Sequence, residues 1–212
     1  MDYEIRSISH EAAEIRAAKD SRKVEGYGIV FNSRSKNLGG FYEIILPGAV
    51  DGVLDNSDVM ACMDHNLSRG ILARSSFGSG SMSLKVDTKG VQFGFVAPNF
   101  PLGDELLEGI RRGDIRNASF AFTVATGGEK WVKQDDGTYL RTISKFEQIY
   151  DMSPCYTPAY QDTKIATRSL TEVQKSEGGT IPNPTGSDPE GKLVTIPESY
   201  FTNLEDRLNY KR

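Results

Sequence analysis

The stretch GIRRGDIRNASFAF, residues 109–122, contains the predicted end of a helix and the predicted start of a strand, and the interpretation of the whole chain depends on this boundary. Upstream, residues 102–112 are predicted to form an amphipathic helix, because apolar residues recur at helical spacing and two arginines occupy the last turn. Gly113 is a typical residue to end such a helix. A predicted strand over residues 115–124 follows, and it places Ser119 among small and aromatic neighbours.

The rest of the folded chain is predicted to be mainly β, with flanking helices. Twenty-one glycines and nine prolines in 212 residues indicate frequent turns, which favours short strands over a helical bundle. Residues 10–19 fit either a helix or a loop, and residues 49–54 fit one helical turn. The other predicted strands, all recognised by alternating or continuous apolar residues, are 2–8, 24–32, 41–45, 58–63, 70–75, 81–87, 91–96, 130–132, 138–142 and 143–152.

Composition divides the chain into a folded domain, residues 1–168, and a C-terminal tail, residues 169–212. Within the tail, residues 176–189 are rich in Gly, Pro and Ser, which predicts a flexible linker that buries no core. Residues 197–211 place tyrosine, phenylalanine and leucine side chains on one side of a predicted short helix.

The overall composition argues against several classes of protein. A net charge of −4 gives no sign of the basic patch that nucleic-acid binding requires. No apolar run approaches the roughly 18 residues that span a bilayer, and the polar N-terminus is unlike a secretory signal. Two cysteines are too few for a disulfide framework or a zinc site. We therefore expect no cofactor, no membrane association and a reducing, intracellular setting.

Only two histidines, His10 and His65, are available as an imidazole base near neutral pH. His10 lies near the N-terminus, where we interpret it as a solvated residue. His65 belongs to the polar triplet DHN, residues 64–66, directly after the apolar strand 58–63, and a strand end holds a half-exposed side chain rigidly. A serine hydroxyl becomes a nucleophile when such a base takes its proton. His65 and Ser119 are thus a candidate base and nucleophile, although spacing alone does not single them out.

Six segments, taken in chain order, resemble the motifs of the HK97-type phage prohead proteases. In that family a strand of the pattern GYAxVFN is followed by ExIxPGAF, by a histidine segment with an LGR strand, and by a DxxGL turn. A nucleophile motif, IxxGxIxxxSFGF, and a strand of the pattern LxEVSxVTxPAY complete the set. The corresponding segments here are GYGIVFN (26–32), EIILPGAV (43–50), DHN with ILAR (64–66 and 71–74), DTKGV (87–91), IRRGDIRNASFAF (110–122) and IYDMSPCYTPAY (149–160).

The resemblance implies that Ser119 is the nucleophile and that His65 is the general base, and then the acid that protonates the leaving amine. It also implies a closed or nearly closed antiparallel β-barrel of the herpesvirus assembly-protease type, in which these two residues lie on adjacent strands. The chain departs from the family pattern at Ala121, Asn66 and Ala73, where glycine, aspartate and glycine are usual. The donors that stabilise the oxyanion are either backbone N–H groups or an arginine, and the sequence does not select between them.

The third catalytic residue is assigned by the same resemblance. Asp151 occupies the position of the acid in the EVS segment, which implies that it orients His65. Glu147 is the alternative, because even spacing in a strand places it on the same face as Asp151. Asp64 is next to the histidine, but neighbouring strand residues point to opposite faces. An interpretation of Asp151 as a residue that caps the turn before Pro154 fits the sequence equally well.

The expected activity is that of a phage or prophage serine endopeptidase that acts in the host bacterial cytoplasm, inside the assembling procapsid. Its expected substrates are the scaffold, or a scaffold-like segment of the major capsid protein, and the protease itself. The protease domain is then residues 1–168, and residues 169–212 are a scaffold-targeting or self-cleaved tail. The assembly-protease resemblance also suggests a homodimer.

Two alternatives stay open on the sequence. Cys155 is a second possible nucleophile for His65, although a small buried apolar residue is the simpler interpretation of it. A non-enzymatic scaffold or head-assembly component that retains the protease fold is the other alternative, and the tail gives it some support.

Overall fold

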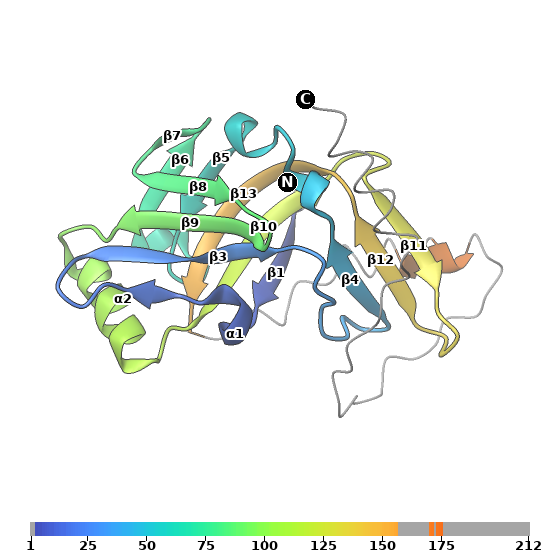
Figure 1. Ribbon diagram of the computed structural model, residues 1–212, viewed down its shortest axis with the longest axis horizontal. Helices are drawn as coiled ribbons and strands as arrows, with labels where there is room; N and C mark the ends of the chain where they lie inside the picture. Colours follow the sequence, from blue (N-terminus) through green and yellow to red (C-terminus); the bar gives the residue numbers. More distant parts are fainter. Residues whose placement is uncertain (1–2, 157–169, 172, 176–212) are drawn as a thin grey trace.

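A computed structural model of the protein describes residues 3–156, 170–171 and 173–175. These residues form three β-sheets flanked by short helices (Figure 1). The largest sheet has six strands in the order β1-β10-β13-β5-β6-β7. Its members are β1 (Glu4–Ile8), β5 (Asp58–Ala61), β6 (Ala73–Ser76), β7 (Ser79–Gly80), β10 (Asn117–Val124) and β13 (Phe146–Cys155).

The other two sheets have the strand orders β2-β3-β9-β8 and β11-β12-β4. Figure 1 shows the four-stranded sheet crossing in front of β10 and β13, with the three-stranded sheet to one side. Their strands are β2 (Arg16–Ala17), β3 (Lys23–Val30), β8 (Met82–Val86), β9 (Gly90–Val96), β4 (Phe41–Ile45), β11 (Glu129–Lys133) and β12 (Tyr139–Ile143). The helices are α1 (His10–Ala13), α2 (Pro101–Arg112) and the 3₁₀ turns η1 (Pro47–Val50), η2 (Leu54–Asn56) and η3 (Leu67–Arg69).

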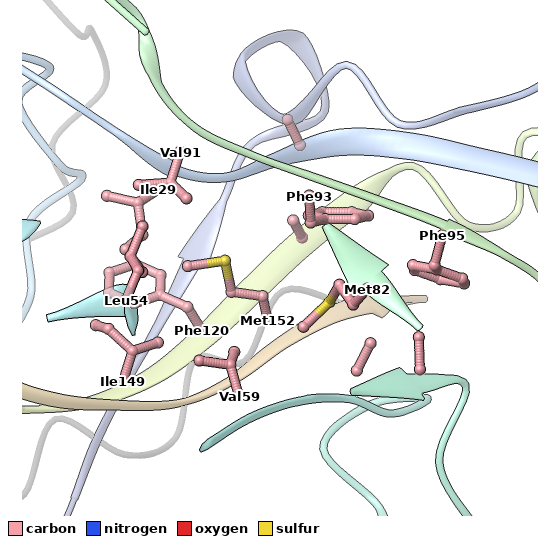
Figure 2. Close-up of a cluster of buried hydrophobic side chains, with 14 of the residues drawn as sticks. Ile29, Leu54, Val59, Met82, Val91, Phe93, Phe95, Phe120, Ile149 and Met152 are labelled. Carbon is pink, nitrogen blue, oxygen red and sulfur yellow. The ribbon is translucent and has the colours of Figure 1, made fainter. Parts of the chain in front are cut away.

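The main core lies between the six-stranded and the four-stranded sheets. Figure 2 shows Phe120 of β10 and Met152 of β13 in one apolar cluster with Ile29 of β3 and Phe93 of β9, and all four are fully buried. A Cβ atom on Gly28 would lie 2.7 Å from Met152 Sδ, so glycine at this position lets β3 approach β13 closely. This packing determines which faces of β10 and β13 are left for a site.

The predicted fold class is confirmed in its main feature, because the protein is mainly β with flanking helices. The expectation of a closed or nearly closed antiparallel barrel is not confirmed: the described strands belong to three sheets, and the pairs β12–β4 and β13–β5 are parallel. Both parallel pairs join strands that are far apart in sequence, where no hairpin imposes an antiparallel direction. The resemblance to the herpesvirus-type arrangement stays a prediction.

The best-defined predicted elements are confirmed. The helix predicted over 102–112 is α2, and Gly113, the residue that caps its C-terminus, adopts the left-handed conformation expected of a helix stop. The strands predicted over 81–87 and 91–96 are β8 and β9, which pair with each other as an antiparallel hairpin. The strand predicted over 143–152 is wrong at its start, because Ile143 belongs to β12 and β13 begins at Phe146.

Two other boundaries differ because of the local backbone conformation and hydrogen bonding, which the spacing of apolar side chains does not reveal. The helix α1 is much shorter than the range 10–19, because Glu14 adopts a left-handed backbone conformation and ends it. The strand β10 begins at Asn117 rather than at residue 115, because the N–H group of Ile115 donates to the Gly109 carbonyl and continues the closure of α2.

A second, smaller apolar cluster contains Leu170, which packs against Phe41 of β4 and Tyr139 of β12. Leu170 is beyond the predicted end of the folded domain, and the division into domain and tail stays a prediction. The linker predicted over 176–189 and the helix predicted over 197–211 lie outside the described residues.

A buried group of charged side chains joins β1 to the three-stranded sheet. Arg141 Nη1 donates to Glu4 Oε2 at 2.6 Å and to Glu43 Oε2 at 2.8 Å, and Arg6 Nε donates to Glu43 Oε1 at 2.9 Å. Burial by itself raises the pKa of Glu4, but the hydrogen bonds and charges of Arg141 and Arg6 outweigh it, so the net pKa is below the usual value. The four charges therefore stabilise one another only as a group.

We predict that Arg141→Ala lowers the free energy of unfolding by about 3–5 kcal/mol, because it leaves Glu4 and Glu43 as under-paired buried charges. Urea denaturation followed by circular dichroism measures this. The control is Arg16→Ala, which removes an exposed ion pair with Glu25 and should change stability little. Equal stability of the two variants would contradict the role given to the buried group.

Candidate active site

Ser119 lies in the middle of β10, on the face that points away from the main core. Its neighbours Ala118 and Phe120 are core residues, and strand alternation turns Ser119 to the opposite face. It is paired across the sheet with Ser153 of β13. Ser119 is fully buried, and its hydroxyl donates a hydrogen bond to the carbonyl oxygen of Arg6 in β1, at 3.0 Å.

His65 lies in the loop between β5 and η3, with 14% of its side chain exposed. Its Nδ1 is 2.7 Å from Oδ1 of Asp151 in β13. The orientation of the two groups does not meet the angular requirement of a hydrogen bond, so these atoms and His65 Nε2 are buried without hydrogen-bond partners among the described residues. At this separation a small rotation of the ring aligns an Nδ1–H group with the carboxylate. We therefore treat the two side chains as one interacting pair, with Nε2 available for proton exchange.

The strand β13 lies between β10, which carries Ser119, and β5, which leads to His65. The expectation that the histidine and the serine lie on adjacent strands is therefore wrong. Asp151 of the intervening strand is paired with Ala121 of β10 and with Met60 of β5. Because cross-strand partners share a face, Asp151 is on the face of Ala121 and, two residues along β10, of Ser119. The structure thus gathers all three residues on one side of the sheet.

Glu147 and Asp151 differ sharply in their surroundings. The register of β13 against β10 shifts twice, and the shifts leave Tyr150 and Glu147 without directly opposed residues. Glu147 is exposed, whereas Asp151 is 7% exposed. The simple even-spacing argument therefore fails, and the structure brings Asp151 rather than Glu147 to His65.

The loop holds His65 in an uncommon backbone conformation. The φ angles of Asp64 and His65 are 50° and 57°, a left-handed region that is uncommon for residues other than glycine. Such conformations cost on the order of 1–3 kcal/mol each and concentrate at functional sites. The Asp64 carboxylate accepts a hydrogen bond from the Tyr156 N–H group at 3.0 Å. Asn66 Oδ1 accepts from the Ser68 N–H group and caps η3.

The profile of the caudovirus prohead serine protease family matches residues 8–176, a range that includes β10, β13 and the His65 loop. The chain belongs to this family. None of the curated proteins and none of the solved structures that were compared matches it. The match confirms the family that the six sequence segments predicted. Membership of the prohead serine protease family indicates a protease of phage capsid maturation, which works on procapsid proteins within the assembling procapsid.

Both cysteines of this prohead protease are buried. Burial, followed by the charges of Asp64 and Asp151, raises the pKa of Cys155 to about 12. Burial, followed by the charge and hydrogen bonding of Asp151, raises the pKa of Cys62 to about 12 as well. Both thiols are therefore protonated near neutral pH, which argues against Cys155 as the nucleophile.

Sequence reasoning missed two neighbours of the prohead protease site. The hydroxyl oxygen of Ser153 accepts a hydrogen bond from the Cys62 N–H group at 2.9 Å. Ser153 is the serine of the EVS-like segment, so the motif contained a signal for it. Arg6 acts on Ser119 through its backbone carbonyl, and no sequence signal marks such a contact.

A large cavity borders β1 and the loop 33–39 and reaches Asn117, but its lining contains neither Ser119 nor His65. The buried Ser119 is therefore not open to a substrate in this conformation. No group of three or more His, Cys, Asp or Glu residues is placed to hold a metal ion in the part of the chain that the structure describes. Among the same residues, no helix has both the length and the apolar character needed to cross a membrane.

We predict that neither cysteine of the native protein reacts readily with iodoacetamide at about pH 8, where a pKa of about 12 leaves roughly one thiol in ten thousand ionised. Both should react in denaturant, and mass spectrometry of the intact protein counts the adducts. Rapid native alkylation of Cys155, accompanied by loss of proteolysis, would favour the cysteine nucleophile instead.

Proposed function

We propose that the protein is a serine endopeptidase in which Ser119 is the nucleophile, His65 the general base and Asp151 the group that orients the imidazole. One observation carries this proposal: in a member of a serine protease family, His65 Nδ1 lies 2.7 Å from Asp151 Oδ1, on the face of the sheet that holds Ser119. The carboxylate favours the tautomer with its proton on Nδ1. The lone pair of Nε2 is then available to take the serine proton.

The hydroxyl of Ser119 starts from a resting position. It donates to the Arg6 carbonyl, so a turn about the Cα–Cβ bond is needed to direct Oγ toward His65. The turn gives up one neutral hydrogen bond, with a net value of about 0.5–1.5 kcal/mol, and gains another. Catalytic hydrogen bonds are often long or misaligned in free enzymes and tighten when substrate binds. The resting position of Ser119 is therefore compatible with a role as nucleophile.

The reaction then follows the roles of a serine protease. Oγ of Ser119 forms a bond to the substrate carbonyl carbon while His65 Nε2 takes the hydroxyl proton. His65 gives that proton to the leaving amine as the C–N bond breaks, which leaves an acyl group on Ser119. Water, deprotonated by the same imidazole, attacks the acyl group, and the imidazole returns the proton to Ser119 Oγ as the acyl–oxygen bond breaks and a carboxylic acid leaves. Each oxyanion donor, a backbone N–H group or an arginine, is worth about 3–4 kcal/mol by analogy.

The proposed substrates are the scaffold, or a scaffold-like segment of the major capsid protein, and the chain itself. Membership of the prohead protease family supports this choice, because these proteins are enclosed with the protease in the procapsid. The homodimer suggested by the herpesvirus-type resemblance stays a prediction.

We predict that Ser119→Ala and His65→Ala abolish processing when each variant is co-expressed with the capsid protein. The expected loss in rate is on the order of 10⁶-fold, since either change removes the nucleophile or its base. Gel electrophoresis and mass spectrometry of the fragments measure processing. Matched controls are Ser33→Ala, at an exposed serine, and His10→Ala, at the other histidine. If both active-site variants still cut the capsid protein as the wild type does, the roles proposed for Ser119 and His65 are wrong.

The identity of the third catalytic residue, which orients His65, is tested by comparing Asp151→Asn with Glu147→Gln. Asp151→Asn should reduce the cleavage rate by roughly 10⁴-fold, because the amide no longer favours the Nδ1–H tautomer of His65. Glu147→Gln is the matched control, and it should leave the rate close to that of the wild type because Glu147 is exposed. Initial rates with a purified capsid-protein substrate distinguish the two, and the reverse ranking would assign the role to Glu147.

A further inference from the structure

The loop that carries His65 is attached to the end of β13 by three hydrogen bonds. The Cys62 N–H group donates to Ser153 Oγ at 2.9 Å, and the Asp64 N–H group donates to the Pro154 carbonyl at 3.3 Å. The Asp64 carboxylate in turn accepts from the Tyr156 N–H group at 3.0 Å. All three partners lie within five residues of Asp151, so the strand that carries the carboxylate also holds the loop that carries the imidazole.

These bonds matter because the ladder between the two strands is short. β13 and β5 are in register at a single pair, Asp151 with Met60. Cys62 comes two residues after Met60, and Ser153 two residues after Asp151, so the Ser153 side chain supplies the next link where the regular ladder gives none. Ser153 is fully buried, and its loss would leave the Cys62 N–H group buried without an acceptor.

The position of Asp64 also explains how the left-handed backbone of His65 is held. Asp64 and His65 have consecutive positive φ angles, which a free loop would relax. Two hydrogen bonds oppose that relaxation: the Asp64 N–H group donates to Pro154 of β13, and the Asp64 carboxylate accepts from Tyr156, directly after β13. The side chain of Tyr156 adds a further link, since its hydroxyl donates to Glu105 of α2 at 3.0 Å.

We propose that Ser153 and Asp64 are positioning residues that hold the His65 imidazole against Asp151. Neither acts on substrate. Ser153 of β13 is a buried hydrogen-bond acceptor for the Cys62 N–H group, which follows β5. Asp64 acts as an acceptor for the Tyr156 N–H group rather than as a charge beside His65. The inference rests on the proposed function for its effect on catalysis, whereas the geometry of the histidine can be measured without it.

The activity test compares removal of each acceptor with its conservative replacement. Asp64→Ala and Ser153→Ala should each lower the cleavage rate by about 10-fold or more, through kcat rather than KM, since substrate does not contact them. Asp64→Asn retains Oδ1 as an acceptor and should recover most of the rate, and Ser153→Thr retains the hydroxyl. Matched controls are Asp135→Ala and Ser33→Ala, at exposed positions. A rate for Asp64→Asn as low as that for Asp64→Ala would overturn the acceptor role.

A spectroscopic test separates the inference from the proposed function. In a His10→Gln background His65 is the single imidazole, and its ¹⁵N spectrum reports the tautomer directly. The parent protein should show mainly the Nδ1–H tautomer, and Asp64→Ala and Ser153→Ala should show a mixture while retaining a cooperative thermal transition. If the tautomer responds but the parent cleaves nothing, the positioning role stands and the protease proposal fails. If the parent cleaves and both alanine variants keep its tautomer and rate, the positioning role is wrong.

Discussion

Burial of Phe120 and Met152 in one core is the constraint on which the site depends. These residues fix the faces of β10 and β13, because alternate side chains of a strand point to opposite sides. A slip of β13 by one residue would move Met152 out of the core and turn Asp151 into it. The hydrophobic effect thus sets the position of a carboxylate that lies on the face of β13 opposite to Met152. The packing of the apolar face therefore determines which side chains lie on the polar face of the sheet.

The residue types of the site could be predicted from the sequence, and their arrangement could be predicted only in part. His65 and Ser119 could be predicted because the chain has two histidines and because both residues lie in ordered motif matches. The helix α2 and the strands of the hairpin β8–β9 could be predicted because their signals are local: the spacing of apolar residues, a glycine after the helix and a short turn between the strands. Local signals do not reveal which distant strands become neighbours. For that reason the insertion of β13 between β10 and β5 was not predicted.

The bulges of β13 show a second limit of sequence reasoning. A strict two-residue period places Glu147 and Asp151 on the same face of the strand, and the sequence contains no signal for the register shifts that lie between them. The shifts follow from the pairing of two curved strands, which is a property of the sheet rather than of the segment. The left-handed backbone at Asp64 and His65 is similar. It exists because β13 and Tyr156 hold the loop at Cys62 and Asp64, and an isolated pentapeptide of the same sequence would not retain it.

The strand β1 links Ser119, the proposed nucleophile, to the buried group of charged side chains. Arg6 is paired with Phe120 across the sheet, so its side chain points to the core side, where it meets Glu43 and the buried ion group. Its carbonyl oxygen accepts the hydroxyl of Ser119. The same residue therefore anchors β1 through its guanidinium and fixes the resting hydroxyl through its backbone. Because a buried ion pair is costly to separate, we expect the charged group to hold β1, and with it the carbonyl oxygen that accepts from Ser119, firmly in place.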